Sequence, residues 1–416
     1  MNAAAPERNN RRVCTGEETA MKDILIVYSK MVVGGSTTSL LSLLNGIDYS
    51  KYRVDLLLYD NGGDLQSFIN PNVNVLPQAK ETTRPLVKLC NPSFWVHLQK
   101  ARRLSRRYKN KLINAQIMSK YEALACGRPR KEYDVGISFL EFWPTEYLCR
   151  RVRAKRKIGW IHIDIKEAGL KKELSQSVFS LLDQVVLVSD PCLQNFVSLY
   201  PEFRQKAVCI ENILNQKTIR DMADRPLEEP LSLEPKACNL VTVCRVAFVS
   251  KGLDRGVNAF GRLKKEGRLT GLRWFVIGDG PDLPRLKDMI RDYGLEKEII
   301  PLGQQINPYH IEKYMDVFFL PSRYEGKPMA VTEAQMLGLV PVVSNYSSAK
   351  DQVRHGVDGV IMENSDDAPY YTLKALVEEK IDLAGMQEKV RNQDYSNTEE
   401  IERFYEIIGP DANLRR

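Results

Sequence analysis

Two continuously apolar runs with one helix-like stretch between them limit what this chain can fold into more than any other feature. Residues 317–320 and residues 340–343 are unbroken apolar runs, which is typical of parallel strands that are buried on both faces of a sheet. Pro328 suits the first turn of a helix, where its missing N–H costs nothing, and Gly338 suits the position just after a helix end. The stretch therefore predicts a strand, a loop, a helix over residues 328–337 and a second strand.

The start of this predicted helix favours an anionic ligand. Its first amides have no partner within the helix and lie at the carboxyl edge of the sheet, where the helix dipole adds to their attraction for phosphate. Glu325 in the loop and Glu333 eight positions later can face the same crevice. Carboxylates beside a phosphate site have a role if the ligand also carries sugar hydroxyls, because a carboxylate accepts paired hydrogen bonds from a vicinal diol. The alternative is an ordinary solvated loop and helix.

Length and composition limit the class of protein. A chain of 416 residues is long enough for two domains, each with its own core. No apolar stretch approaches the roughly 20 residues of a membrane-spanning helix, and the first residues lack the apolar core of a secretory signal. The eight cysteines are scattered without a CxxC pair, and the four histidines are too dispersed for a metal cluster. We therefore expect a cytoplasmic protein with reduced thiols and no metal site, whose membrane attachment, if any, is peripheral.

The positive charge of the chain is concentrated in one region. Residues 101–172 carry 19 Lys and Arg against 7 Asp and Glu, a local charge of +12, so the net +7 of the chain leaves −5 for the remainder. Residues 94–112 interleave aromatic and aliphatic side chains with cations, which include Arg102, Arg103, Arg106 and Arg107. A basic helix with aromatic residues suits an anionic membrane surface. A solvated helix face is the alternative, and we expect no nucleic-acid binding because no such module is recognisable.

The chain divides into a tail, two domains and a linker. Residues 1–20 are polar and without periodicity, so we expect a disordered tail, and Met21 could be the natural start. If so, deleting residues 1–20 leaves expression and activity intact. Strand-like runs predict a first Rossmann-like domain over residues 21–213 and a second over residues 239–396, joined by a linker rich in Pro and Glu at residues 214–238.

Two loops of the first domain are candidates for ligand contact. Gly34 and Gly35 follow a predicted strand over residues 23–28 and open a helix, where adjacent glycines let the backbone approach a ligand closely. Neither GxGxxG nor GK[ST] occurs there, which disfavours a nicotinamide enzyme or an NTPase. His162 falls at the carboxyl end of a predicted strand over residues 155–164, where open α/β sheets bind ligands. A plain turn and a structural histidine are the alternatives.

The first predicted strand of the second domain leads to two cations. Arg245 ends the strand, and Lys251 follows six positions later. Two cations at this edge suit a diphosphate, because arginine binds it with paired donors and lysine as a point charge. Surface cations are common, so solvated side chains are the alternative.

The order of these motifs resembles that of the retaining glycosyltransferases of family four. The motifs are the Gly34-Gly35 loop, Arg245 with Lys251, the Gly-Asp-Gly-Pro turn of residues 278–281, and the string from Glu325-Gly326 to Glu333. The resemblance implies the GT-B architecture, an α/β fold in which two Rossmann-like, doubly wound domains face each other across a cleft. It also implies that the last helix, within residues 397–416, returns to the first domain.

The resemblance gives each candidate residue a role. Glu325 would contact the donor sugar and His162 would lie near the transferred sugar, while Arg245 and Lys251 would grip the donor diphosphate. These four are the candidate catalytic residues. The candidate donor-binding residues are Gly34, Gly35, Arg245, Lys251, Gly303, Glu325, Gly326, Pro328, Met329, Ala330 and Glu333, with Glu333 on the ribose hydroxyls. Lys327 stands where the family often has an apolar residue, which puts the donor preference in doubt and adds a candidate phosphate contact.

The implied function is that of a retaining hexosyltransferase that moves a sugar from a nucleotide diphosphate sugar to a hydroxyl of a glycan or lipid-linked glycan. Bacterial surface polysaccharide synthesis, as of lipopolysaccharide or capsule, at the inner face of the plasma membrane fits the basic region. No cofactor is expected, and the lack of an Asp-x-Asp motif predicts independence of metal. The alternatives are a non-catalytic subunit that binds nucleotide sugar or glycan beside a partner transferase, and another enzyme of similar fold, such as an epimerase or a pyridoxal-dependent phosphorylase.

Overall fold

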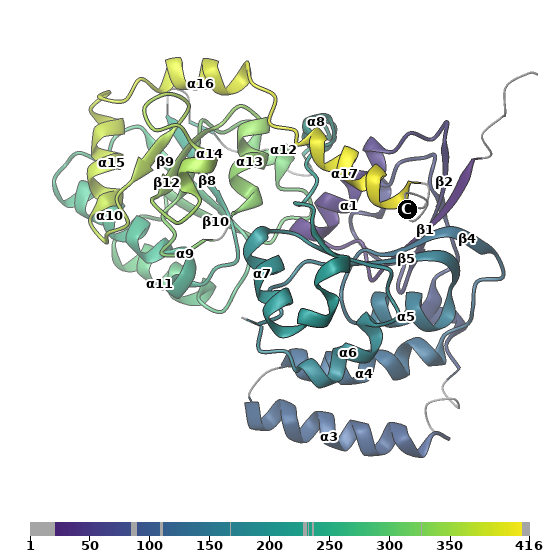
Figure 1. Ribbon diagram of the computed structural model, residues 1–416. Coiled ribbons are helices and arrows are strands. Elements are labelled where there is room, and N and C mark those ends of the chain that lie inside the picture. Colours follow the sequence, from purple (N-terminus) through teal and green to yellow (C-terminus); the bar gives the residue numbers. More distant parts are fainter. Residues whose placement is uncertain are drawn as a thin grey trace, which may run out of the picture.

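The computed structural model contains two separate parallel sheets, which form two bodies joined near α8 (Gln216–Ala223) and α17 (Thr398–Ile408) (Figure 1). It describes residues 21–84, 90–108, 111–166, 168–227, 231, 233–234, 237–325 and 327–409. The predicted tail of residues 1–20 and Gly326 lie outside the described residues.

The first sheet has seven strands in the order β3-β2-β1-β4-β5-β6-β7. All of its strand pairs are parallel, so the carboxyl ends of the strands share one edge. The strands are β1 (Lys22–Tyr28), β2 (Tyr52–Leu58), β3 (Asn74–Val75), β4 (Glu132–Ser138), β5 (Arg153–Ile161), β6 (Gln184–Leu187) and β7 (Ala207–Cys209).

The second sheet has six strands in the order β10-β9-β8-β11-β12-β13, again all parallel. The strands are β8 (Cys238–Val243), β9 (Leu272–Ile277), β10 (Ile299–Gly303), β11 (Val317–Leu320), β12 (Val340–Ser344) and β13 (Val360–Met362). Both strand orders reverse once beside the first strand of the sheet, which is the doubly wound pattern. The predicted fold class of two Rossmann-like domains is therefore confirmed.

Helices connect the strands of each sheet. Those of the first domain are α1 (Gly35–Gly46), α3 (Pro92–Tyr108), α4 (Lys111–Ala125), α5 (Trp143–Arg151), α6 (Lys172–Phe179) and α7 (Asp190–Leu199). Then come α8 (Gln216–Ala223), α9 (Phe248–Lys251), α10 (Leu253–Lys265), α11 (Leu283–Asp292), α12 (Tyr309–Glu312), α13 (Met329–Met336), α14 (Ala349–Gln352), α15 (Ala368–Val377), α16 (Leu383–Arg391) and α17 (Thr398–Ile408).

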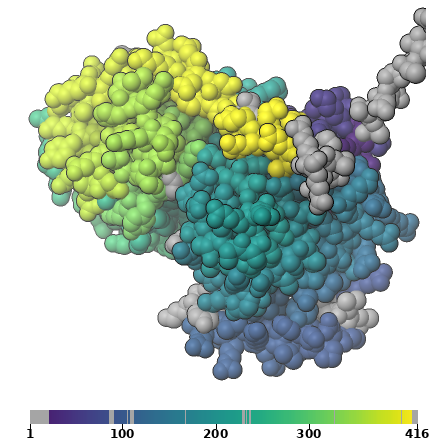
Figure 2. All heavy atoms as spheres, viewed as in Figure 1, coloured from purple at the N-terminus to yellow at the C-terminus, as the bar shows by residue number. Residues whose placement is uncertain are grey.

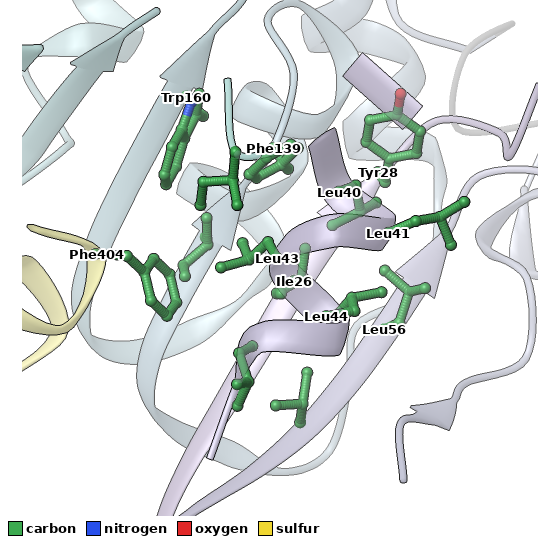
Figure 3. Packing of buried hydrophobic residues seen from close by; sticks show 14 of the residues in the cluster. Ile26, Tyr28, Leu40, Leu41, Leu43, Leu44, Leu56, Phe139, Trp160 and Phe404 are labelled. Atoms are coloured by element: carbon green, nitrogen blue, oxygen red, sulfur yellow. The ribbon is translucent and has the colours of Figure 1, made fainter. Parts of the chain in front are cut away.

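Strand β1, at the centre of the first sheet, buries both of its faces. Along β1, Ile24 and Ile26 contribute to one hydrophobic cluster, whereas Leu25 and Val27 contribute to another. The leucines of α1 (Leu40, Leu41, Leu43 and Leu44) cover Ile26 and the neighbouring β2 (Figure 3). This double burial explains why the strands read as continuous apolar runs in the sequence.

The last helix, α17, packs on the first domain. Phe404 is fully buried in the same cluster as Trp160 of β5, with ring centroids 6.3 Å apart (Figure 3). Tyr405 stacks on Tyr52 at 5.5 Å, and its hydroxyl accepts a hydrogen bond from the Asp48 amide at 2.8 Å. The chain therefore crosses between the domains twice, once near α8 and once between α16 and α17 (Figures 1 and 2).

The predicted linker of residues 214–238 contains a helix, α8. Asn215 caps it by accepting a hydrogen bond from the Thr218 amide, and its own residues Ile219 and Met222 are buried. Arg220 donates to the carbonyl oxygen of Met336 in α13 at 3.1 Å, so α8 also contacts the second domain. The first part of the predicted linker is therefore helical because its apolar residues have helical spacing, and the Pro-rich sequence begins only after α8.

The basic stretch that was predicted as one helix forms two. α3 ends at Tyr108 and α4 begins at Lys111, and α3 lies on the outside of α4, away from the sheet (Figure 1). Among the described residues, no helix is long and apolar enough to cross a membrane.

Candidate active site

The predicted strand, loop, helix and strand unit is present and shapes one wall of the site. β11 and β12 pair in parallel, with Val317 opposite Val340, and α13 begins at Met329 with Pro328 as its N-cap. Ala330 and Met329 are half-buried at the N-terminal turn. The unpaired amides of this turn therefore lie at the carboxyl edge of the sheet, where an anion would be stabilised.

A cavity of about 430 Å³ lies between the two domains in front of α13, and we call it the glycine-loop cavity. From the first domain it is lined by the loop before α1, and from the second by the carboxyl ends of β8, β9 and β10. The predicted residues that it brings together are Gly34, Gly35, Arg245, Met329, Ala330 and Glu333. Gly303 ends β10 directly before Gln304 and Gln305, which also line the cavity.

Two glycines let backbone form the walls of this cavity. A Cβ atom on Gly35 would lie 3.0 Å from Sδ of Met329, so the loop of the first domain closely approaches α13. Gly278 has a φ of 134°, and a Cβ there would lie 1.9 Å from the carbonyl oxygen of Cys244. Only glycine fits at position 278, because both the backbone conformation and the space exclude a side chain.

Lys251 and Glu325 form an ion pair beside this cavity but do not line it. Nζ of Lys251 donates to both carboxylate oxygens of Glu325, at 2.7 and 2.9 Å, and Oγ of Ser322 donates to Oε1 at 2.7 Å. The side chains are only 23% and 9% exposed. A half-buried pair of this kind holds a cation and a carboxylate ready for a ligand that carries both phosphate and hydroxyl groups.

Glu333 is a buried carboxylate at the wall of the glycine-loop cavity. Burial raises its pKa to about 7, although a hydrogen bond with Tyr309 opposes the shift. The hydroxyl of Tyr309 also lies 3.2 Å from Oγ1 of Thr38 in α1, so the Glu333 side chain is linked to the first domain through one tyrosine. Glu312, buried nearby, has its pKa raised by burial and by the charge of Glu333.

His162 follows directly after β5, on the first-domain side of the cleft, and does not line the glycine-loop cavity. Its ring lies 5.0 Å from that of Phe139, and burial lowers its pKa to about 4, an effect that the side chain of Asn212 partly offsets. The backbone amide of His162 donates to Oε2 of Glu141 at 3.1 Å. His162 is therefore a neutral imidazole at neutral pH, and its role near a transferred sugar stays a prediction.

Lys327 does not point at the α13 amides. Its ammonium group forms an ion pair with Glu211, which lies between β7 and α8, so it contacts the other domain across the cleft. The sequence predicted a candidate phosphate contact for Lys327, but in this structure its partner is a carboxylate.

Several residues of the site were missed by the sequence analysis. Thr38, Tyr309 and Glu312 gather around Glu333, and Glu141 lies beside His162. No local pattern identifies them, because Thr38 and Tyr309 are 271 positions apart and meet only when the domains face each other. Among the described residues, no group of three or more His, Cys, Asp or Glu is placed to hold a metal ion.

The second domain matches a known protein family, and parts of the chain resemble known glycosyltransferases. Residues 228–394 match the family model described as glycosyl transferases group 1. A UDP-Gal:alpha-D-GlcNAc-diphosphoundecaprenol alpha-1,3-galactosyltransferase of Escherichia coli is 35% identical over 120 residues, which are 28% of this chain and 31% of the relative. A lipopolysaccharide 1,6-galactosyltransferase of Salmonella typhimurium is 32% identical over 119 residues, 24% of this chain and 33% of the relative. The similarity to these two relatives thus spans about a third of their length.

Solved structures resemble the whole chain. HepE of Anabaena, in complex with UDP and glucose, superimposes with a TM-score of 0.61 at 14% identity, over 92% of this chain and 98% of that one. TarM gives a TM-score of 0.63 at 13% identity, over 94% and 99%. These likenesses establish the fold. The chain therefore has the GT-B architecture of two facing Rossmann-like domains, and its second domain matches the glycosyl transferases group 1 family.

Proposed function

We propose that the protein is a retaining glycosyltransferase that moves a hexose from a UDP-sugar to a hydroxyl of a glycan or lipid-linked glycan in bacterial surface polysaccharide synthesis. The observation that carries the proposal is the glycine-loop cavity, where the Gly34-Gly35 loop, Arg245 and the buried Glu333 meet at the start of α13. The E. coli and Salmonella relatives are galactosyltransferases of such glycans by name, and HepE was solved with UDP.

Different residues would bind the nucleotide, the diphosphate and the sugar of the donor. The nucleotide would occupy the glycine-loop cavity with Glu333 accepting hydrogen bonds from the ribose, and the diphosphate would lie against Arg245, Lys251 and the α13 amides. Glu325, held by Lys251, would then face the sugar. Family-four membership and these roles rest on the motif match.

The reaction would break the bond between the anomeric carbon and the diphosphate oxygen and form a bond from that carbon to the acceptor oxygen. Negative charge develops on the leaving diphosphate, and preorganised cations and amides are usually the largest catalytic contribution to such a step. The acceptor would attack on the face from which the diphosphate leaves, and the diphosphate would take the acceptor proton. These cations make a metal ion unnecessary, and we expect transfer to persist in EDTA.

Contacts between the domains support closure over the donor. The Tyr309–Thr38 hydrogen bond and the Lys327–Glu211 ion pair both cross the cleft, on either side of the α13 N-terminus. Closing the cleft would keep water from the reacting carbon and so limit hydrolysis of the donor.

A thermal-shift screen with UDP, GDP, ADP and CMP tests the donor site. We expect UDP to stabilise the protein, since a ligand at about 100 times its Kd adds about 2.7 kcal/mol to the free energy of unfolding. Arg245→Ala should lose most of this shift, because Arg245 lines the cavity, while Lys297→Ala on the exposed surface should keep it. If no nucleotide shifts the melting temperature, the proposed function is wrong.

The main alternative is a non-catalytic subunit of the same fold that supports a partner transferase. It predicts binding of UDP without release of UDP from any UDP-sugar, whereas the enzyme releases UDP even when water is the acceptor. The intact Lys251–Glu325 pair and the buried Glu333 favour the enzyme, because charged groups that are costly to bury need a function to maintain them.

The helix α3 is the surface that we propose for an anionic membrane. One side of α3 packs on α4 through Phe94, Leu98 and Leu104, while Trp95 and Val96 are 47% and 64% exposed. Arg102, Arg103, Arg106 and Arg107 are exposed on the same helix, which is the outermost layer of the first domain (Figure 1). Apolar side chains beside cations match a lipid headgroup region, which would hold the protein at the inner face of the membrane.

Cosedimentation with vesicles of phosphatidylglycerol tests this surface. Each cation near the headgroups contributes about 1 kcal/mol, so Arg102→Ala/Arg106→Ala should weaken partitioning about thirtyfold. The control is Lys287→Ala/Lys297→Ala, which removes two exposed cations from the second domain. Equal partitioning of the arginine variant and the wild type would rule out this role of α3.

A further inference from the structure

A second cavity, of about 350 Å³, lies between the domains on the other side of the α13 N-terminus. We call it the Asn212 cavity. Met329 lines both cavities, but Ala330 and Glu333 face the glycine-loop cavity, whereas Thr332 and Gln335 face this one. One turn of α13 therefore separates the proposed nucleotide site from a second space that can hold a small ligand.

The walls of the Asn212 cavity are rich in neutral hydrogen-bonding groups. Ser189 and Asn212 come from the segments after β6 and β7, at the carboxyl edge of the first sheet, and Tyr395 comes from the crossing that leads to α17. The charged side chains of the lining are of both signs and include two ion pairs, since Lys327 binds Glu211 and Arg354 binds Asp358, beside Lys350, Asp351 and Glu399. Hydroxyl and amide groups with paired charges favour a neutral polyhydroxylated ligand over a free anion.

One polar atom of the cavity lining, the hydroxyl of Tyr395, is shielded from solvent and has no hydrogen-bond partner among the described residues. Oδ1 of Asn212 is shielded as well, and its side chain interacts with the imidazole of His162. An unpaired buried polar atom is unfavourable, so native structures usually supply a partner for it. Burial raises the pKa of Tyr395 to about 12, so its hydroxyl keeps its proton at neutral pH and can donate. The side chain of Asn212 also faces His162, near which we expect the transferred sugar.

We propose that the Asn212 cavity binds one sugar residue of the acceptor glycan, with Tyr395 donating a hydrogen bond to it and Asn212 accepting one. This assignment rests on the proposed glycosyltransferase function and names where part of its acceptor is held. The cavity volume is at the lower end of ligand pockets, which suits a single sugar ring rather than a longer chain. It leaves the rest of the acceptor to extend out of the cleft.

The test uses saturation-transfer NMR on the full chain in saturating UDP. The probes are the methyl α-glycosides of glucose, galactose and N-acetylglucosamine. We expect at least one to bind the wild type, and Tyr395→Phe to weaken its Kd about tenfold, as expected for one lost hydrogen bond. The matched control is Tyr200→Phe, since Tyr200 is another buried tyrosine of the first domain, does not line this cavity, and has its pKa raised by burial to about 12 as well.

The outcomes separate this inference from the proposed function. Glycoside binding that Tyr395→Phe weakens and Tyr200→Phe leaves unchanged, with the UDP shift intact in both variants, supports the assignment. Binding that is equal in Tyr395→Phe and the wild type places the sugar elsewhere and overturns it, as does the absence of any glycoside signal. If UDP itself gives no thermal shift with the wild type, the proposed function and this inference fall together.

Discussion

Replacing Lys251 by alanine is expected to lower kcat for the release of UDP from the donor about 10²- to 10³-fold, the range found when one preorganised donor is removed from a charged transition state. The ammonium group lies 2.7 Å from Glu325 and is three-quarters shielded from solvent, so water cannot replace it well. The variant also leaves the Glu325 carboxylate with only Ser322 as a hydrogen-bond donor among the contacts that the structure describes. A coupled assay of UDP release, with water or a glycan as acceptor, measures the loss.

Two controls distinguish catalysis from a general effect of charge. Lys251→Arg keeps the cation and should recover part of the rate, while Lys287→Ala removes an exposed lysine from α11 and should leave kcat unchanged. A kcat within threefold of wild type for Lys251→Ala, with normal melting temperature, would show that Lys251 does not stabilise the leaving group.

Glu333→Gln should make the protein more stable in mild alkali while weakening its binding of UDP. Burial raises the pKa of Glu333 from the usual 4.5 to about 7 in the folded protein. The folded state therefore holds this proton more tightly than the unfolded state, and stability falls as the pH rises from about 4.5 to 7. At about 1.36 kcal/mol per pKa unit, the wild type bears a cost of roughly 3 kcal/mol at pH 8 that the neutral glutamine avoids.

Urea unfolding at pH 4.5 and pH 8 measures this difference. The free energies of unfolding of the two proteins should differ little at pH 4.5, and that of the variant should be higher by roughly 3 kcal/mol at pH 8. The Kd of the variant for UDP should rise about 10- to 100-fold, because charge-assisted hydrogen bonds to the ribose are lost. In the variant, burial still raises the pKa of Glu312, but the contribution from the Glu333 charge is lost, so relief of Glu312 adds to the stability gain at pH 8 in the same direction. A stability gap that is the same at both pH values would mean that folding does not raise the pKa of Glu333.

The fold could be predicted from the sequence because parallel strands that are buried on both faces leave an unmistakable pattern. The runs at residues 317–320 and 340–343 became β11 and β12, and the turn residues around them marked α13 within one position at each end. The bounds of β3 were harder to predict, because a strand of two residues at the edge of a sheet has too few side chains to show a pattern. The break between α3 and α4 was missed, since basic residues continue through it.

The site could be predicted only in part, because motif residues identify positions but not their partners. Arg245, Met329 and Glu333 line the glycine-loop cavity, whereas Lys251 and Glu325 form an ion pair with each other beside it. The contacts that join the domains, such as Tyr309 with Thr38 and Lys327 with Glu211, depend on the relative placement of two folded units. Spacing along the chain carries no information about that placement, so these residues could be found only in three dimensions.

Because α17 completes the hydrophobic core of the first domain, the second domain is, in topological terms, an insertion into the first. During synthesis on the ribosome the second domain can therefore finish folding while the first still lacks the ring of Phe404 against Trp160. The first domain would close its core last, once α17 has emerged, so that the cleft between the domains is assembled only after both domains have been synthesised.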